Sequence, residues 1–266
     1  MSDMPTSGAQ DHESHWEIYP CWIGEAYGLV RVDIAWFDPA PLATHATGID
    51  VSMVLQSPRD DGMPQGDEYE VMNDVEAAIE SAAPDAIFIG ATVAGGVRHW
   101  YLCSADPVAD EQAIVAATRS VAPTHELATR SYDDAGWEQY FDFLYPNSLA
   151  WQYIQDQRLL GHMRESLGDD GSAPRIVSHW AYFPTRRARR AFIKQVKEMD
   201  YTIQGKSTHR DKTDERYALH FDTLYEIAPK DITPHTERLV QAATACEGRY
   251  DGWEVPVITG DTPPAP

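Results

Sequence analysis

Apolar and polar residues alternate along several short stretches in the first half of the chain. Between residues 29 and 37 every second position is apolar, and these positions are Val30, Val32, Ile34 and Trp36. A period of two is that of a half-buried β-strand, so the pattern predicts a strand with these side chains turned inward. The aromatic run at residues 16–23 predicts its hairpin partner, and residues 49–55 alternate in the same way.

A helical period follows in the same half. After Asp67, a typical N-cap residue, apolar side chains recur every three or four positions, at Met72, Val75, Ile79 and Ala82. Gly95-Gly96 separates two apolar runs at residues 86–94 and 97–103, which is a strong hairpin signal. Similar signals predict a helix after Asp106-Pro107, a strand at residues 127–132 and a short helix at residues 137–144.

The second half predicts the element order β-α-β-β-α-β. Its strands are expected at residues 175–183, 201–204, 216–227 and 250–258, and its helices after Thr185 and at Thr233-Pro234. This order is the ferredoxin-like, split-βαβ pattern, in which a four-stranded antiparallel sheet carries two helices on one face. The first half predicts a related antiparallel sheet with helices, so the fold class is α+β with two domains.

A stretch rich in Gly, Asp and Ser at residues 168–174 predicts a linker between these halves. The long helix that begins after Asn147 is then a connector at the end of the first domain. The expected domains are residues 14–167 and residues 174–258.

Charge is divided unequally between the halves. Residues 1–147 hold five Arg and no Lys against 25 Asp and Glu, a net charge of −20, whereas residues 148–266 hold 16 Lys and Arg against 17 Asp and Glu, a net charge of −1. A strongly acidic half repels nucleic acid and favours basic partners. The same acidity also keeps a protein soluble without any partner.

The three cysteines and the hydropathy pattern bear on where the protein works. Cys21, Cys103 and Cys246 are far apart and form no CxxC pair, so neither a disulfide framework nor a zinc site is expected. No run approaches eighteen apolar residues, so a spanning helix is not expected. We expect a cytoplasmic protein with no membrane segment.

Catalytic and cofactor motifs are not evident. The sequence has no GxSxG, P-loop or HExxH pattern, and no cofactor is expected. His179 and His220 fall in predicted strands, where a metal or acid–base pair would need the two side chains to meet across the sheet. Histidines in strands are more often satisfied structurally.

Two sets of residues resemble known bacterial families. The second half resembles the regulator of ribonuclease E activity B family (RraB), through its element order, the segment Tyr250-Asp251-Gly252-Trp253 and the supporting run at residues 179–183. The first half resembles the uncharacterised domain often found upstream of it. The markers of that likeness are Trp16, the turn at residues 61–64, Gly95-Gly96 and the aromatic run from Trp137 to Pro146. The stand-alone regulators are acidic, whereas the matching half here is nearly neutral.

The resemblance implies a non-enzymatic regulator that binds a protein, such as a ribonuclease or another basic protein, and that is similar to inhibitors of ribonuclease E-type RNA processing. Nucleic acid is not the expected partner. Two alternatives stay open. One is an unrecognised enzyme, a hydrolase or nuclease with an interdomain site, and the other is an RNA-binding module that uses a basic helix.

Two surfaces are candidates for contact with a partner. Tyr250, Asp251, Gly252 and Trp253 form a turn beside the last strand, where aromatic side chains commonly anchor interfaces, although a packed strand cap is the more usual role of such a segment. Arg186, Arg190, Lys194 and Lys197 recur at helical spacing and form a basic face. We expect this basic face to dock on the acidic first domain rather than on RNA.

Overall fold

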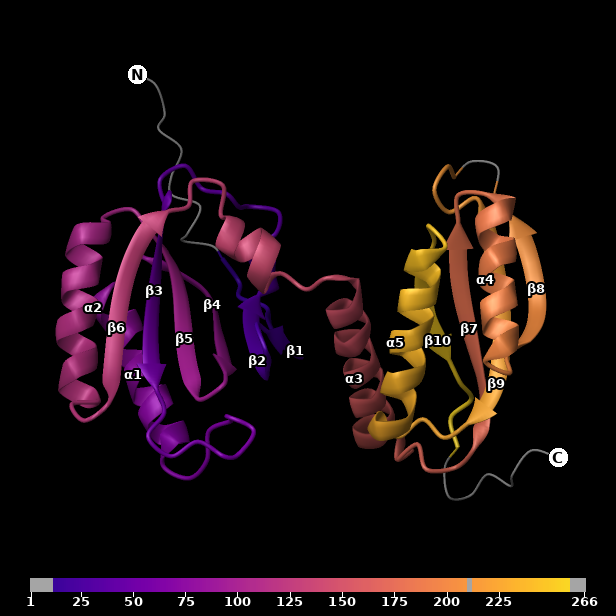
Figure 1. The fold of residues 1–266 in the computed structure, drawn as a ribbon, viewed down its shortest axis with the longest axis horizontal. Coiled ribbons are helices and arrows are strands. Elements are labelled where there is room, and N and C mark those ends of the chain that lie inside the picture. The colour runs from indigo at the N-terminus through magenta and orange to yellow at the C-terminus, as the bar shows by residue number, and fades with distance from the viewer. Residues whose placement is uncertain (1–11, 210–211, 259–266) are drawn as a thin grey trace. The chain divides into compact units, whose positions relative to one another are not determined.

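The computed structural model describes residues 12–209 and 212–258. The chain divides into two compact units between Pro146 and Asn147, each with its own sheet (Figure 1). This confirms the predicted α+β class with two domains.

The sheet of the first unit has six strands in the order β1-β2-β4-β5-β3-β6, and each neighbouring pair is antiparallel. Its strands are β1 (Trp16–Ile23), β2 (Ala26–Asp33), β3 (Thr47–Val54), β4 (Ile87–Ala94), β5 (Val97–Ser104) and β6 (Glu126–Asp133). Helix α1 (Glu68–Ala82) joins β3 to β4, and α2 (Pro107–Val121) joins β5 to β6. The segment from β3 to β6 is therefore a β-α-β-β-α-β unit, extended at the β4 edge by the β1–β2 hairpin.

The helical stripe expected in this unit forms its core. Met72, Val75 and Ile79 of α1 are buried against strand residues of β3 and β5, including Val51 and Trp100. At the turn between β4 and β5, both Gly95 and Gly96 have positive φ, 56° and 79°. Two such residues make the primed turn whose twist suits a hairpin, which explains the pair of glycines.

The other face of this sheet is partly covered by the short π-helix Gln139–Leu144. The Tyr140 hydroxyl donates to the Asp33 carbonyl at 2.9 Å, and the Tyr19 hydroxyl donates to the Leu144 carbonyl at 2.9 Å. Val30 and Val32 of β2 are fully buried, as the alternation predicted.

The strand predicted over residues 29–37 ends earlier than expected. After Asp33 the chain forms a 3-10 turn, Ile34–Trp36, because the Asp33 side chain accepts from the Ala35 amide at 3.1 Å and caps the turn. Trp36 is still buried, as expected, but it is positioned by the turn rather than by a strand.

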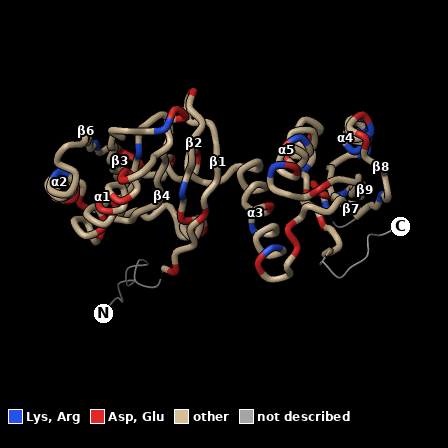
Figure 2. The backbone as a smooth tube through the Cα atoms, turned by 90° about the horizontal axis from the view of Figure 1, so that it is seen from below, with Lys and Arg blue, Asp and Glu red and all other residues tan. Residues whose placement is uncertain are grey.

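The second unit has the predicted order β-α-β-β-α-β. Its elements are β7 (Arg175–Phe183), α4 (Arg186–Glu198), β8 (Thr202–Thr208), β9 (Tyr217–Tyr225), α5 (Pro229–Ala245) and β10 (Arg249–Glu254). The sheet order β10-β7-β9-β8 repeats the arrangement of β6-β3-β5-β4 in the first unit. The chain is thus built from two copies of one topology. Helices α4 and α5 lie on one side of the second sheet (Figure 2), with Phe192, Val196 and Leu239 buried against Phe221.

The long helix α3 (Ser148–Leu167) packs within the second unit, against α5. Leu160 and Met163 lie in one buried cluster with Ile232 and Trp253. This division differs from the expected boundary, which placed the helix in a first domain ending at residue 167 and began the second at residue 174.

Residues 168–174 are not a free linker, which corrects the interpretation of this stretch. The Asp169 and Arg175 side chains form a buried, bidentate ion pair, and Asp169 also accepts the Ile258 amide at 2.7 Å. The Ile227 amide donates to the Gly171 carbonyl at 3.0 Å. A sequence rich in turn residues is fixed here by partners that come from β7, the connection between β9 and α5, and the segment after β10.

Candidate functional site

The Tyr250–Trp253 segment closes the core of the second unit. Tyr250 lies opposite Ala181 and Trp253 opposite His179, with an irregularity in the pairing between them. The added residue lets both aromatic rings face the helices, although three positions along a regular strand would turn them to opposite faces. Gly252 has φ of 96°, which a glycine adopts without strain. Both rings are buried, and only Asp251 is exposed.

Hydrogen bonds also hold the ring of Tyr250. The Tyr250 hydroxyl lies 2.7 Å from Nδ1 of His179, and the Tyr225 hydroxyl lies 3.0 Å from Nε2 of the same ring. Burial lowers the pKa of His179 to about 3, so the ring is neutral, with one nitrogen donating and the other accepting. The direct contribution of Tyr250 and Trp253 to a partner surface stays a prediction, and their burial assigns them a packing role.

His179 and His220 do not meet. His179 faces the helices and is fully buried, whereas His220 lies one position from the Phe221 that pairs with His179, and therefore faces the other side of the sheet. Among the residues that the structure describes, no group of three or more His, Cys, Asp or Glu side chains could hold a metal ion.

The basic face of α4 forms as the helical spacing predicted. Arg186, Arg190, Lys194 and Lys197 are all exposed, and the buried residues Ala188, Phe192 and Val196 occupy the opposite side. Lys194 lies 3.9 Å from Glu198 of the same helix. Docking of this basic face on the first domain stays a prediction.

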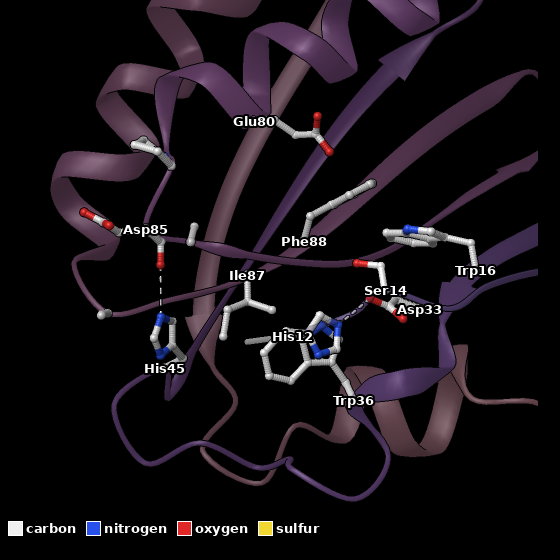
Figure 3. A pocket seen from close by; sticks show the side chains of 13 residues that line it. His12, Ser14, Trp16, Asp33, Trp36, His45, Glu80, Asp85, Ile87 and Phe88 are labelled. Atoms are coloured by element: carbon white, nitrogen blue, oxygen red, sulfur yellow. Dashed lines mark hydrogen bonds and ion pairs between the residues drawn. The ribbon is translucent and has the colours of Figure 1, made fainter. Parts of the chain in front are cut away.

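A pocket of about 720 Å³ lies at one end of the first sheet (Figure 3). Five segments build it: the start of β1 with the residues before it, the end of β2 with the turn after it, His45 before β3, the end of α1 with the connection into β4, and Ala105 after β5. Its apolar walls are the rings of Trp16, Trp36 and Phe88 together with Ile87.

Three polar side chains of this pocket, those of His12, Asp33 and His45, form hydrogen bonds. Nε2 of His12 lies 2.7 Å from Oδ2 of the buried Asp33, and the His12 ring stacks on Trp36 with 3.9 Å between the ring centroids. His45 hydrogen-bonds to the Asp85 carbonyl at 3.0 Å through Nε2. Glu80 points toward the open space above Phe88 (Figure 3). Ser14 also lines the pocket close to Asp33 (Figure 3), and among the described residues no serine, threonine or cysteine side chain is hydrogen-bonded to His12.

One wall of the pocket already holds a cation on its aromatic surface. The guanidinium of Arg31 lies 4.7 Å from the centroid of the Trp16 ring and 5.3 Å from that of Phe88. Arg31 also pairs with Glu76 at 2.6 Å. Aromatic faces beside carboxylates are the surroundings that attract guanidinium and ammonium groups.

An apolar row continues from the pocket along the hairpin, and we define it as Trp16, Ile18, Trp22 and Tyr27. The three β1 residues are two or four positions apart and lie on one face, and Trp22 contacts Tyr27 edge-on at 5.6 Å. All four are exposed, Trp22 by 70%. Since β1 is the edge strand of its sheet, both the row and the backbone edge are accessible within this unit.

Sequence reasoning did not find this pocket. Asp33 occurs in an alternating run, where it is indistinguishable from a solvent-facing strand residue, and His12 and His45 belong to separate connecting segments. The only signal was Asp33 followed three residues later by Trp36, which is consistent with a capped turn but says nothing of the residues that meet it. The sequence showed the exposed row only as an aromatic strand. Its exposure depends on the place of β1 at the edge of the sheet, which the sequence does not give.

No helix in the described part of the chain is both long and apolar enough to span a membrane.

The chain was compared with curated proteins, with solved structures and with family models. None of the curated proteins matches it. Among solved structures, it is similar to an unknown protein from Galdieria sulphuraria, with 11% identity over 80% of this chain and 99% of that one and a TM-score of 0.22. It is also similar to a putative glycine cleavage system transcriptional repressor, with 9% identity over 79% of this chain and 98% of that one and a TM-score of 0.25. Scores this low support no functional argument.

The family models are more informative. Residues 14–145 match a family of unknown function, DUF695, and residues 153–255 match the family described as regulator of ribonuclease activity B. The second match begins inside α3, in agreement with the packing of that helix in the second unit. The chain therefore matches two family models in succession, that of DUF695 first and that of the regulator of ribonuclease activity B family second.

Proposed function

We propose that this protein is a non-enzymatic regulator that binds another protein, and that its partner is a ribonuclease of the E type whose RNA processing it restrains. The observation that carries the proposal is the match of residues 153–255 to the regulator of ribonuclease activity B family. The three cysteines are free, which is consistent with a reducing compartment, so we place this activity in the cytoplasm.

The first domain supports the proposal with a surface suited to a basic segment of such a partner. Residues 1–147 have a net charge of −20. The pocket at the end of the first sheet combines aromatic walls with Glu80, and the exposed apolar row begins at its rim in Trp16. A segment that carries Arg or Lys beside apolar side chains would place its cation in the pocket and its apolar groups on the row.

The direct test measures binding and inhibition together. The full chain is titrated into a purified E-type ribonuclease while binding is followed by calorimetry and cleavage of a labelled RNA by gel. We expect a complex that slows cleavage and that weakens as salt is raised, because opposite surface charges are screened. A complex without any change in cleavage would contradict the regulatory role, and the lack of a complex would remove the proposed partner.

Paired variants locate the surface. Glu80→Lys places a cation in the pocket and is expected to weaken binding of a basic segment by about tenfold, since like charges in contact are strongly unfavourable. Asp74→Lys makes the same charge change at another exposed position of the same helix and serves as the control. Equal effects of the two variants would mean that only the overall charge of the domain matters.

A further inference from the structure

The second unit has a sheet face that none of the helices in its described residues covers. Helices α4 and α5 lie on the other side of β7, β8 and β9 (Figure 2). Side chains on the uncovered face include Trp180 and Tyr182 of β7 and His220 of β9, because they alternate with the buried residues His179, Ala181 and Phe221. Two neighbouring strands in the middle of the sheet thus present aromatic rings outward.

The rings form a shallow platform. Trp180 and His220 pair directly across the two strands and stack with 4.7 Å between centroids and 7° between planes. Nε2 of His220 is buried and has no hydrogen-bond partner among the described residues. A cavity of about 410 Å³ lies over the platform and is bordered by Trp180, Tyr182 and His220, with Gly205 leaving it open on the β8 side.

A basic pocket lies at the edge strand β8 on the side of the sheet that α4 covers, because its β8 residues pair with the helix-facing Leu219 and Tyr217. It has a volume of about 250 Å³ and is lined by Arg186, Arg189 and Arg190 of α4 with Lys206 and Thr208 of β8. Lys206 borders both this pocket and the cavity over the rings, so the two share this residue at the β8 edge. Arg189 donates to the carbonyls of Ser207 and Ala218. Arg186 and Arg190 are exposed, and neither forms an ion pair with a described carboxylate.

We propose that this surface binds single-stranded RNA, with phosphates at Arg186, Arg190 and Lys206 and bases stacked on Trp180 and Tyr182. Cations that track a backbone beside aromatic rings that accept unpaired bases are the two elements of single-strand recognition. Ser207 and His209 border the same cavity and offer a hydroxyl and an imidazole to a ribose 2′-hydroxyl. A duplex cannot use the platform, because its bases are already stacked.

Ion pairing within the domain determines which cations are available to bind phosphates. Arg249 lies 5.4 Å from the Tyr182 ring, but its guanidinium is paired with both Glu215 and Asp251. Its charge is therefore neutralised, and the phosphate contacts fall to the α4 and β8 side. The second half of the chain has a net charge of only −1, so the strong acidity belongs to the other domain.

This inference does not rest on the proposed regulation of a ribonuclease, and its test needs no nuclease. The full chain is titrated into a fluorescein-labelled oligo-U RNA of about ten nucleotides, a length within the range that one sheet surface covers, and anisotropy is recorded at about 50 mM and about 200 mM salt. We expect salt-sensitive binding to this RNA and weaker binding to the matched DNA strand and to duplex RNA.

Three variants test the assignment. Trp180→Ala is expected to weaken binding by about tenfold, since it removes one stacking ring. Arg186→Ala with Arg190→Ala should weaken binding and reduce the slope of log affinity against log salt by about two, one for each phosphate that the variant no longer neutralises. Lys194→Ala with Lys197→Ala removes the same charge from the same helix outside the pocket and should change binding less than about twofold. Thermal unfolding by circular dichroism checks that each variant is folded.

Lack of binding by the full chain would overturn the proposal, as would a loss in the Lys194 and Lys197 control equal to that in the Arg186 and Arg190 variant. Equal affinity of RNA and DNA would overturn the choice of RNA. An acidic peptide that binds more tightly than RNA, and that depends on Trp180 in the same way, would make the surface a protein-binding one.

Discussion

Trp253 and Asp156 are 97 residues apart in the chain, and the indole Nε1 of Trp253 donates a 2.7 Å hydrogen bond to Oδ1 of Asp156. Asp156 also accepts from Gln152 at 2.7 Å and from Thr236 at 2.6 Å. One buried carboxylate thus ties α3 to α5 and to the Tyr250–Trp253 segment. Burial raises the pKa of Asp156, although these three hydrogen bonds oppose the shift.

Replacement of this carboxylate should destabilise the second unit. Asp156→Ala leaves the Trp253 indole N–H buried without an acceptor and the Thr236 hydroxyl with only the carbonyls of its own helix, which together costs about 3 kcal/mol of unfolding free energy. Urea unfolding followed by far-UV circular dichroism measures the change. Glu165→Ala, an exposed position of the same helix, is the control and should cost less than about 0.5 kcal/mol. A loss below about 1 kcal/mol for Asp156→Ala would contradict the network.

Limited proteolysis should cleave the chain close to the boundary between Pro146 and Asn147. Asn147, Ser148 and Leu149 are exposed, whereas Asp169 is buried in its ion pair with Arg175. We expect proteinase K to cut at residues 147–149 and to leave residues 168–172 intact, with mass spectrometry identifying the fragments. Arg175→Ala should open the second site, because it leaves Asp169 buried without its cation. A dominant cut at residues 168–172 in the unmodified chain would support the boundary that the sequence suggested.

Much of the second unit could be predicted because each of its signals is local. The stripe Ala188, Phe192 and Val196 has the helical period, and the alternation around Leu219 and Phe221 has that of a strand, so both buried faces follow from spacing alone. The helix expected to begin at Thr233-Pro234 instead begins at Pro229 and contains Pro234. Two prolines near one helix start give the same signal, and spacing cannot choose between them.

The arrangement of side chains in the candidate sites could not be predicted from local spacing, because it depends on partners that are distant in the sequence. Asp33 meets His12 only once the turn after β2 has formed, and Asp169 is fixed only by Arg175 across a stretch of turn residues. Lys206 was part of an unremarkable polar run, and its position between aromatic rings and arginines follows from the order of the strands. The basic face itself was visible from the sequence, but its aromatic neighbour was not.

Glu76 should be the most sensitive carboxylate of the first unit. It pairs with Arg31 at 2.6 Å and Arg98 at 3.2 Å and accepts the Trp100 indole N–H at 3.0 Å. Glu76→Ala leaves two partly buried guanidinium groups and one indole without this acceptor, so we expect a loss of about 3 kcal/mol. Chemical unfolding measures it, with Asp74→Ala on an exposed turn of α1 as the control. Equal stability of the two variants would mean that water satisfies both arginines.

His179 should make the second unit sensitive to acid. Its pKa is lowered by burial to about 3, whereas an unfolded histidine titrates near 6.5. A group whose folded pKa is lowered in this way favours folding in its neutral form, so its contribution is complete above about pH 6.5 and is lost as the pH falls toward about 3. The expected loss of unfolding free energy approaches about 1.4 kcal/mol per pH unit, or about 2 kcal/mol at pH 5.

Urea unfolding at several pH values measures this dependence in the unmodified chain and in His179→Gln. The variant is less stable at pH 7, because the Tyr250 and Tyr225 hydroxyls lose their partner, but its deficit should narrow by about 2 kcal/mol at pH 5. His162→Gln, at an exposed position of α3, should follow the unmodified chain throughout. A constant difference between His179→Gln and the unmodified chain from pH 7 to pH 5 would show that His179 gains its proton without unfolding the domain.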